Sequence, residues 1–328
     1  AFPDEFPFQT PEEIPITDSK VLKVFTGVEV LGVNPNQVFG EVIGTTGLPE
    51  FGTQLTKRML VDIRPSTISD LLKVSGLSHG TDVWEGNSRD LLLGLKDGVS
   101  PIPFKELIGC RDDIMVYLMS RGLSSKISFQ IMESVRKGKG LSASQEKEMI
   151  KHQIPKWYID SCKMIKYMFP KAHATAYVIM ALRIAWFKVH KPLYYYAAYF
   201  SRRANAFDIV ALVGGERAIN KRLLELKDKQ ERKTATNKDI DTFQALLLAL
   251  EMVARGFSFK QINIKTSDWR DFLVDKESNS LLIPFSAMDS LGASTAQSVV
   301  EAREQEAFTS KRDVITRTKI NATVFEKL

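Results

Sequence analysis

The apolar residues of this chain recur mostly at helical spacing. Ile68, Leu71, Leu72 and Val74 follow the 3.6-residue period and predict a helix within residues 67–77. Helical spacing also predicts helices at 112–119, 126–135 and 239–254. The capping signal at residues 17–19 predicts a short helix at 20–26, and a helix at 54–62 is expected to end before Pro65. The pattern therefore indicates a mainly α fold.

The longest predicted helix begins at Pro170, because proline suits a first helical turn, where its missing N–H costs nothing. The run 172–189 is nearly unbroken, and Pro192 prevents its continuation. A second, aromatic helix is expected at 193–200. We expect Pro170 to place the free amides of the next residues at a positive helix end.

Only the last third of the chain suggests strands. Residues 262–285 alternate loosely between apolar and polar, which predicts a few short β strands. Residues 286–328 are expected to form two helices joined by a Leu-Gly turn at Leu291 and Gly292, followed by a further helical stretch.

Proline and glycine divide the chain. Residues 1–20 are rich in proline and acids and predict an extended N-terminal segment. The charge-rich stretch 216–238 suggests an exposed helix or linker, and a boundary is expected near 205–215. We therefore predict domains at 21–205 and 206–328, with the helical hairpin near 286–328.

Charge is distributed unevenly. The net charge is +6, but residues 121–203 hold sixteen basic and four acidic side chains, a net +12. A basic segment in an otherwise acidic chain indicates a polyanion partner. The alternative is a solvated lysine-rich helix face.

Composition excludes several classes of protein. Cys110 and Cys162 form no metal-binding motif and are expected to be buried free thiols. Neither a secretory signal nor a membrane span is evident, so we expect a cytoplasmic location and no membrane partner. The first residue is Ala1 rather than Met, which suggests a fragment or a processed chain.

A basic pentamer at residues 136–140 is the first candidate site. Arg136, Lys137 and Lys139 lie within four residues, and Gly138 and Gly140 would let the backbone approach a ligand closely. This composition suits phosphate oxygens. The alternative is that the cations complement the C-terminal end of the preceding helix dipole.

Residues 169–177 form the second candidate site. Phe169, His173 and Tyr177 are spaced four apart and line one helix face, while Lys171 adds a donor at the helix start. Such a face could stack a base and hold its phosphates. A core helix with a satisfied histidine is the alternative.

The third candidate site is the turn at Gly292. Amides after such a turn can bind a DNA backbone phosphate without reading sequence, which is the helix-hairpin-helix mode. A plain helical hairpin is the alternative. The residues concerned are Ser290, Gly292, Ala293, Ser294 and Thr295.

Converging carboxylates for two-metal nucleotidyl transfer are missing from the sequence. Asp112 and Asp113 are adjacent and better suited to capping a helix, and Asp239 and Asp241 precede another helix. We therefore expect no catalytic residue, metal site or bound cofactor in this chain.

Several long strings resemble the PolC-type alpha subunit of DNA polymerase III, from about residue 15 to the end. They are residues 76–84 (GLSHGTDVW), 109–115 (GCRDDIM), 131–140 (IMESVRKGKG), 167–177 (YMFPKAHATAY) and 190–200 (HKPLYYYAAYF). Family members often have Gly-Leu-Gly at the hairpin, where this chain has Ser290, Leu291 and Gly292.

The resemblance implies a helical fingers domain followed by a duplex-binding domain with helix-hairpin-helix motifs. In such polymerases two Mg²⁺ ions are held by palm aspartates that lie upstream of the similar part. By motif, the residues expected to face the triphosphate are Arg136, Lys137 and Lys139, with Arg111 as a weaker candidate; those around the base pair and nucleotide are Lys171, His173 and Tyr177.

The expected function is that of one part of a replicative DNA-directed DNA polymerase, inactive by itself. Its expected partners are primer-template DNA and a deoxynucleoside triphosphate, with the sliding clamp and other replisome subunits binding the parent protein. One alternative is a non-enzymatic helix-hairpin-helix module in repair or chromosome maintenance. A weaker one is an enzyme acting on small nucleotides.

Overall fold

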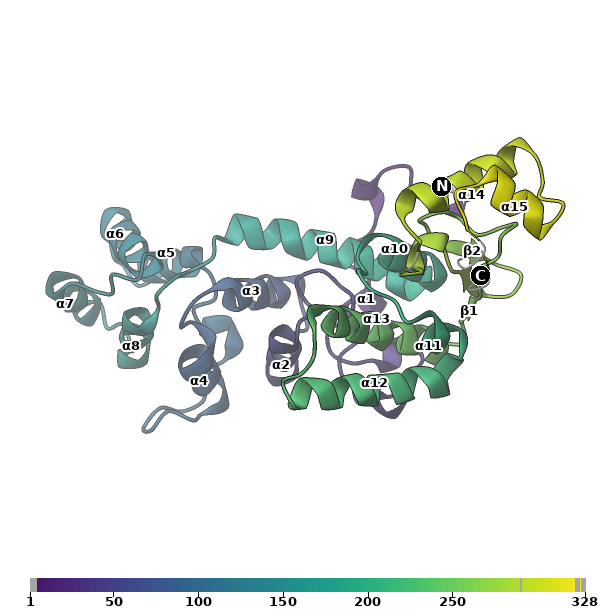
Figure 1. Ribbon diagram of the computed structural model, residues 1–328. Helices are drawn as coiled ribbons and strands as arrows, with labels where there is room; N and C mark the ends of the chain where they lie inside the picture. The colour runs from purple at the N-terminus through teal and green to yellow at the C-terminus, as the bar shows by residue number, and fades with distance from the viewer. Residues whose placement is uncertain (1–4, 290, 322–324, 326–328) are drawn as a thin grey trace. The chain divides into compact units, whose positions relative to one another are not determined.

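The computed structural model describes residues 5–289, 291–321 and 325. The chain forms two compact units, of which unit 1 comprises residues 1–27 and 48–185 and unit 2 comprises residues 28–47 and 186–328 (Figure 1). The division falls inside one helix, α9 (Lys171–His190). These units are defined by packing, and the functional boundaries at 21, 205 and 206 stay a prediction.

Unit 1 is built from helices. They are α1 (Ser19–Lys23), α2 (Gln54–Ile63), α3 (Ile68–His79), α4 (Arg89–Leu93), α5 (Arg111–Ser120), α6 (Ser125–Arg136), α7 (Ala143–Lys151), α8 (Lys156–Met164) and the start of α9, with short 3₁₀ turns at Pro11–Glu13 and Phe104–Glu106 and an irregular turn at Trp84–Ser88. In Figure 1, α5 to α8 gather at one end of this unit.

Local capping sets where these helices begin. The Asp18 side chain accepts the amides of Lys20 and Val21 at the start of α1. Thr67 and Asp70 form a reciprocal capping box at the start of α3. The predicted helices at 20–26, 54–62, 67–77, 112–119 and 126–135 are thus confirmed, whereas the sequence analysis did not identify α4, α7 and α8.

Unit 2 combines helices with one small sheet. It contains the rest of α9, α10 (Pro192–Arg202), α11 (Ile209–Val213), α12 (Gly215–Glu231), α13 (Asn237–Ala254), β1 (Ser258–Lys260), β2 (Leu273–Asp275), β3 (Ser280–Leu282), α14 (Ala293–Gln305) and α15 (Lys311–Arg317), with 3₁₀ turns at Glu29–Leu31, Pro35–Gln37 and Phe285–Ala287. The charge-rich stretch 216–238 is mostly the helix α12.

The sheet has the strand order β1-β3-β2, with β1 parallel and β2 antiparallel to β3. Short strands were predicted, but the alternation at Ile262 and Ile264 misplaced the first of them. Asn263 makes a turn there, because its side chain accepts the Lys265 amide and its carbonyl accepts the Ser267 amide. Turn chemistry therefore overrides the alternation.

The prediction of a helix before Gly292 was also wrong. A single 3₁₀ turn, Phe285–Ala287, occupies that position, since Pro284 and Gly292 leave only a short segment between them. Two helices, α14 and α15, follow Gly292 instead of one helix on each side of it. The overall class, mainly α with a few short strands, is confirmed.

A buried polar network stabilises unit 2. Lys188 of α9 is fully buried and donates to the carbonyls of Gly44 and Thr46 at 2.7 and 2.6 Å. The Glu251 carboxylate of α13 accepts from Lys188 at 2.9 Å and from the Tyr196 hydroxyl at 2.7 Å. The network ties residues 28–47, which are distant in sequence, to the helices of this unit.

Within the described part of the chain, no helix combines the length and the apolar character that crossing a membrane requires.

Candidate nucleotide and DNA interface

The start of α9 lies against the start of α5. The Asp112 carboxylate accepts the Lys171 amide at 2.8 Å, and the Arg111 amide donates to the Phe169 carbonyl at 3.2 Å. Arg111 and Asp112 are also 3.9 Å apart through Nε and Oδ2. Two predicted site residues, Arg111 and Lys171, are thereby brought together.

Pro170 was predicted to lie in the first turn of the helix, but α9 begins one residue later, at Lys171. The Pro170 carbonyl accepts the Ala174 amide at 3.2 Å, and the helix proper begins at Lys171. Pro170 is therefore the capping residue, and the first backbone amide that has no partner within the helix belongs to Lys171. Because the Asp112 carboxylate binds that amide, a phosphate at this helix end would meet a resident anion.

Four rings gather beside this helix start. The Phe169 and Tyr177 rings lie 6.0 Å apart at 18°. His79, at the end of α3, lies 4.5 Å from Phe169 at 21° and 5.9 Å from Tyr177 at 7°. The exposed His173 ring stands nearly perpendicular, at 85° to Phe169 and 69° to Tyr177. The predicted shared face of Phe169, His173 and Tyr177 is confirmed.

His79 was not among the predicted site residues. Its only sequence signal is its place in the string 76–84, because its partners lie far away along the chain. The ring makes close contacts with Glu50 and with the Ser75 carbonyl, both at 2.8 Å. We call His79, Phe169 and Tyr177 the ring platform.

The basic pentamer forms the C-terminal end of α6. Glu133 accepts both Arg136, through Nε and at 2.8 Å through Nη2, and Lys137 at 3.0 Å. These hydrogen bonds, with that from Arg136 the stronger, lower the pKa of Glu133 to about 2. Lys139 is exposed. Arg136 and Lys137 are therefore oriented by a carboxylate before any ligand arrives.

Glycine in the pentamer has a structural use. Gly138 has a φ of +70°, its amide donates to the Val135 carbonyl at 2.9 Å, and the Lys139 amide donates to Ser134 at 3.0 Å. These paired bonds form a Schellman motif that ends α6. The amides of 138 and 139 are thus already bonded within the chain.

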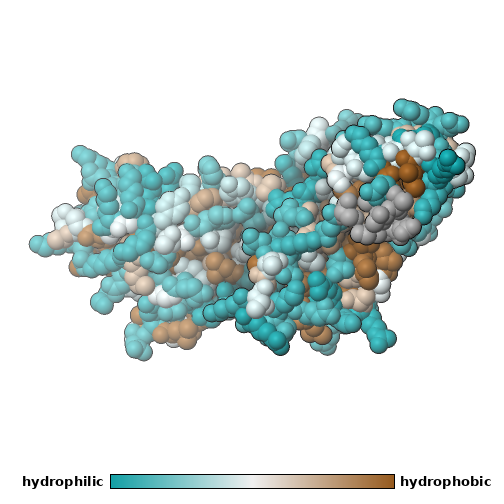
Figure 2. Space-filling model, in the orientation of Figure 1, coloured by the Kyte–Doolittle hydropathy of each residue, from teal (hydrophilic) through white to brown (hydrophobic). Residues whose placement is uncertain are grey.

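The segment 166–169 links the pentamer to the ring platform. A Cβ on Gly138 would lie 2.5 Å from the Lys166 carbonyl oxygen, so the pentamer packs directly on this segment. Thr81, two residues after His79, pairs with Tyr167 through a backbone bridge. The cationic loop and the rings consequently flank one short stretch of backbone. In Figure 2, the end of unit 1 that holds α5 to α8 is mostly hydrophilic.

Gly292 begins α14 as its capping residue. Its φ of −66° is open to other residues, and its carbonyl accepts the amides of Thr295 and Ala296 at 3.0 Å. Ala293 and Ser294 follow in the first turn, and the Lys319 ammonium binds the Ser294 hydroxyl at 2.6 Å. Ser290 lies outside the described residues. The other four predicted residues, 292–295, therefore lie at one helix N-terminus with a lysine beside it.

The predicted helix-capping carboxylates do cap helices. Asp113 accepts the amides of Gly109 and Cys110 at 3.0 Å each, and Asp239 accepts the Thr236 amide at 3.0 Å. Across residues 5–289, 291–321 and 325, no three His, Cys, Asp or Glu side chains come close enough to hold a metal ion. Asp113 and Asp239, which accept backbone amides at two separate helix starts, do not fit the paired Mg²⁺ ions of nucleotidyl transfer.

Both cysteines are buried free thiols, as predicted. Burial raises the pKa of Cys110 to about 12 and raises the pKa of Cys162 as well. The thiolate is the reactive form, so neither side chain is suited to act as a nucleophile.

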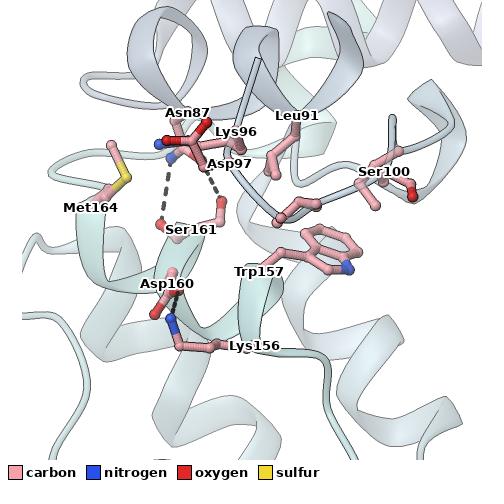
Figure 3. Close-up of a pocket in the computed structure, with 13 residues that line it drawn as sticks. Asn87, Leu91, Lys96, Asp97, Ser100, Lys156, Trp157, Asp160, Ser161 and Met164 are labelled. Carbon is pink, nitrogen blue, oxygen red and sulfur yellow. Dashed lines mark hydrogen bonds and ion pairs between the residues drawn. The ribbon is translucent and has the colours of Figure 1, made fainter. Parts of the chain in front are cut away.

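A separate cavity of about 530 Å³ lies in unit 1, between the loop after α4 and helix α8. Figure 3 shows Trp157 beside Leu91 and Ser100, with the bonded pair Asn87 and Ser161 at another part of the wall. Its lining includes none of the residues predicted to bind nucleotide.

Comparison with known families gives two matches. Residues 6–156 match the bacterial DNA polymerase III alpha subunit finger domain, and residues 256–328 match a helix-hairpin-helix motif. The second match includes α14, α15 and the Gly292 turn, although the helix expected before the turn is a 3₁₀ turn.

Whole-chain comparison finds PolC-type DNA polymerases III. The chain is 51% identical to that of Oceanobacillus iheyensis over 318 residues, 97% of this chain and 22% of the relative. It is 47% identical to that of Streptococcus sanguinis over 324 residues, again 97% and 22%. For Listeria monocytogenes the identity is 47% over 316 residues, 96% and 21%. The chain spans about a fifth of the length of these relatives.

Proposed function

This chain is a relative of one segment of the PolC-type DNA polymerases III and has the finger domain of the alpha subunit at residues 6–156; from that premise we propose that it grips the incoming deoxynucleotide and the primer-template duplex in a replicative DNA polymerase. The chemistry takes place elsewhere in such a polymerase, where carboxylates would hold Mg²⁺. The chain by itself does not polymerise.

The ring platform is the observation that carries this proposal. Three nearly parallel rings, His79, Phe169 and Tyr177, lie within about 6 Å of one another near the start of α9, where the Lys171 side chain is exposed. Flat aromatic faces bind any base by stacking, which suits a polymerase that must accept all four nucleotides. Lys171 and His173 then lie beside the base and its pair.

The triphosphate is bound by the pentamer. Arg136, Lys137 and Lys139 supply the cationic donors, and Arg111 is a further donor at the start of α5, beside the Asp112 carboxylate that accepts the Lys171 amide. Glu133 forms ion pairs with both Arg136 and Lys137. Phosphate oxygens compete with that carboxylate, since they offer the same charge-assisted bonds.

The duplex is held by the N-terminus of α14. Amides in the first turn after Gly292, the hydroxyls of Ser294 and Thr295 and the nearby Lys319 suit one backbone phosphate. Such contacts position the duplex without reading its sequence. The polymerase acts in the cytoplasm, and the sliding clamp and other replisome subunits bind it.

Tyr177→Ala tests the proposal in a polymerase that contains this chain. The variant is expected to raise the KM for every deoxynucleotide about tenfold or more, because it removes a stacked ring worth about 1–3 kcal/mol. Tyr177→Phe keeps the ring and serves as the matched control. An unchanged KM in Tyr177→Ala would favour a non-enzymatic DNA-binding module instead.

Primer extension by the 328-residue chain alone is the second test. No template-directed synthesis is expected with Mg²⁺, primer-template and all four deoxynucleotides. Extension of the primer by the purified chain would contradict the proposal that the carboxylates lie elsewhere.

A further inference from the structure

The ring plane of His79 is held by contacts at both of its nitrogens. Nδ1 lies 2.8 Å from the Ser75 carbonyl oxygen, and Nε2 lies 2.8 Å from Oε2 of Glu50. The two nitrogens lie on different sides of the ring, so rotation of the ring about its bond to Cβ breaks both contacts. A neutral imidazole can donate to one of these acceptors, and an imidazolium can donate to both.

These contacts join three separate elements of unit 1. Ser75 and His79 belong to α3, while Glu50 lies in the loop before α2, with a φ of +66°. Phe169 lies two residues before the start of α9, and Tyr177 lies in the second turn of that helix. The imidazole is thus fixed by α3 and the loop, and it offers its flat face to the rings at α9.

The Phe169 and Tyr177 rings lie nearly parallel to the imidazole ring. The interplanar angles are 21° and 7° to His79, and 18° between the two rings themselves. The Phe169 ring has no polar atom, and the Tyr177 hydroxyl lies on the axis of ring rotation, so the orientation of both rings depends mainly on packing against neighbours. The in-plane contacts of His79 supply a fixed reference for both rings.

We propose that His79, anchored by Glu50, is a positioning residue that sets the plane of the base-stacking platform for the incoming nucleotide. The inference rests on the proposed function and adds a pair of residues to it. His79 acts through Phe169 and Tyr177, so its loss weakens nucleotide binding and leaves the chemical step and the duplex contacts unchanged.

A purely structural role predicts a different result. In that case, loss of the Glu50 contact lowers the thermal midpoint, and the apparent kcat and the amplitude of DNA binding fall together as folded protein is lost, while KM stays unchanged. A positioning role predicts a separate rise in the KM for deoxynucleotide. Glu50→Gln distinguishes charge from anchoring, because its uncharged amide can still form a hydrogen bond with Nε2, as acceptor or as donor.

The experiment measures single-nucleotide incorporation by a polymerase that contains this chain. Glu50→Ala and His79→Phe are expected to raise the deoxynucleotide KM about five- to tenfold, with kcat and the duplex Kd within about twofold of wild type. Glu50→Gln is expected to stay within about twofold throughout. Glu50→Asp, a milder change that shortens the acceptor, is expected to give an intermediate KM and covers the case in which Glu50→Ala folds poorly.

Tyr177→Ala, measured in the same series, distinguishes failure of the positioning role from failure of the proposed function. If Tyr177→Ala raises KM while Glu50→Ala, Glu50→Asp and His79→Phe leave it unchanged, the positioning role is overturned and the proposed function stands. If Tyr177→Ala also leaves KM unchanged, both are overturned. A parallel fall of apparent kcat, DNA-binding amplitude and thermal midpoint in Glu50→Ala and Glu50→Asp, with KM unchanged, overturns positioning in favour of a structural role.

Discussion

The Lys188 ammonium lies 2.9 Å from the Glu251 carboxylate, and both side chains are buried, at 0% and 4% exposed. Removing one partner of a buried ion pair leaves the other charge without compensation. Lys188→Met is therefore expected to lower the free energy of unfolding by about 3–5 kcal/mol, measured by urea titration. Lys221→Met, at an exposed position of the same unit, is the control and is expected to cost less than about 0.5 kcal/mol.

The double variant Lys188→Met with Glu251→Gln checks the cause. Removing the unpaired negative charge is expected to recover about 1 kcal/mol or more of the loss, because the two residues are coupled directly. If the two losses simply add, the ion pair is not the reason for the instability.

Gly138 and Gly140 form a natural pair for testing the end of α6. Both have positive φ values, +70° and +68°, so alanine is strained at either position. A Cβ at 138 also meets the Lys166 carbonyl oxygen at 2.5 Å, whereas a Cβ at 140 meets nothing within 4 Å. Gly140→Ala is expected to cost about 1–2 kcal/mol and Gly138→Ala clearly more, by urea unfolding. Equal costs would show that the Lys166 contact relaxes freely.

Asp112 caps the start of α9 from another helix. Asp112→Ala is expected to lower the free energy of unfolding by about 0.5–2 kcal/mol, since the Lys171 amide loses its acceptor. Asp97→Ala, at an exposed loop position of the same unit, is the control and should be nearly neutral. A stability of Asp112→Ala equal to that of the control would argue against the cap.

The lowered pKa of Glu133 predicts that the chain loses stability in acid. Its pKa falls from the ordinary 4.5 to about 2 in the folded chain, chiefly through its hydrogen bond to Arg136 and then that to Lys137. The stabilisation is complete above the ordinary value and disappears as the pH falls toward the folded value. The stability difference between wild type and Glu133→Gln, from urea titrations, should be constant above about pH 5 and shrink toward pH 2. A difference independent of pH would exclude the ion pairs as its source.

Ser294→Asp separates DNA binding from helix stability. A negative charge in the first turn of α14 favours the helix dipole but repels a DNA phosphate. We expect the duplex Kd of the chain to rise about tenfold without loss of thermal stability. Asn279→Asp adds the same charge in the turn between β2 and β3 and is the control. Equal effects of the two changes would refute a phosphate contact at α14.

The amino-acid sequence by itself determined most helices and their starts. The caps of α1 and α3 lie within three residues of the amides they bind, so the string of residues already contains the interaction. Long motif strings also resemble the PolC-type polymerases that the comparisons match. Where local signals conflicted, as at Asn263 and Gly292, the expected element was misplaced because a side-chain turn or a short segment prevailed over periodicity.

Only the tertiary structure decided which residues share a site. Asp112 and Lys171 are 59 positions apart, and Lys188 and Glu251 are 63 apart. His79 likewise joins Phe169 and Tyr177, which lie about ninety residues further along the chain. Such pairs form because packing brings distant segments into contact, and periodicity, which reports only on near neighbours, carries no record of which segments will meet.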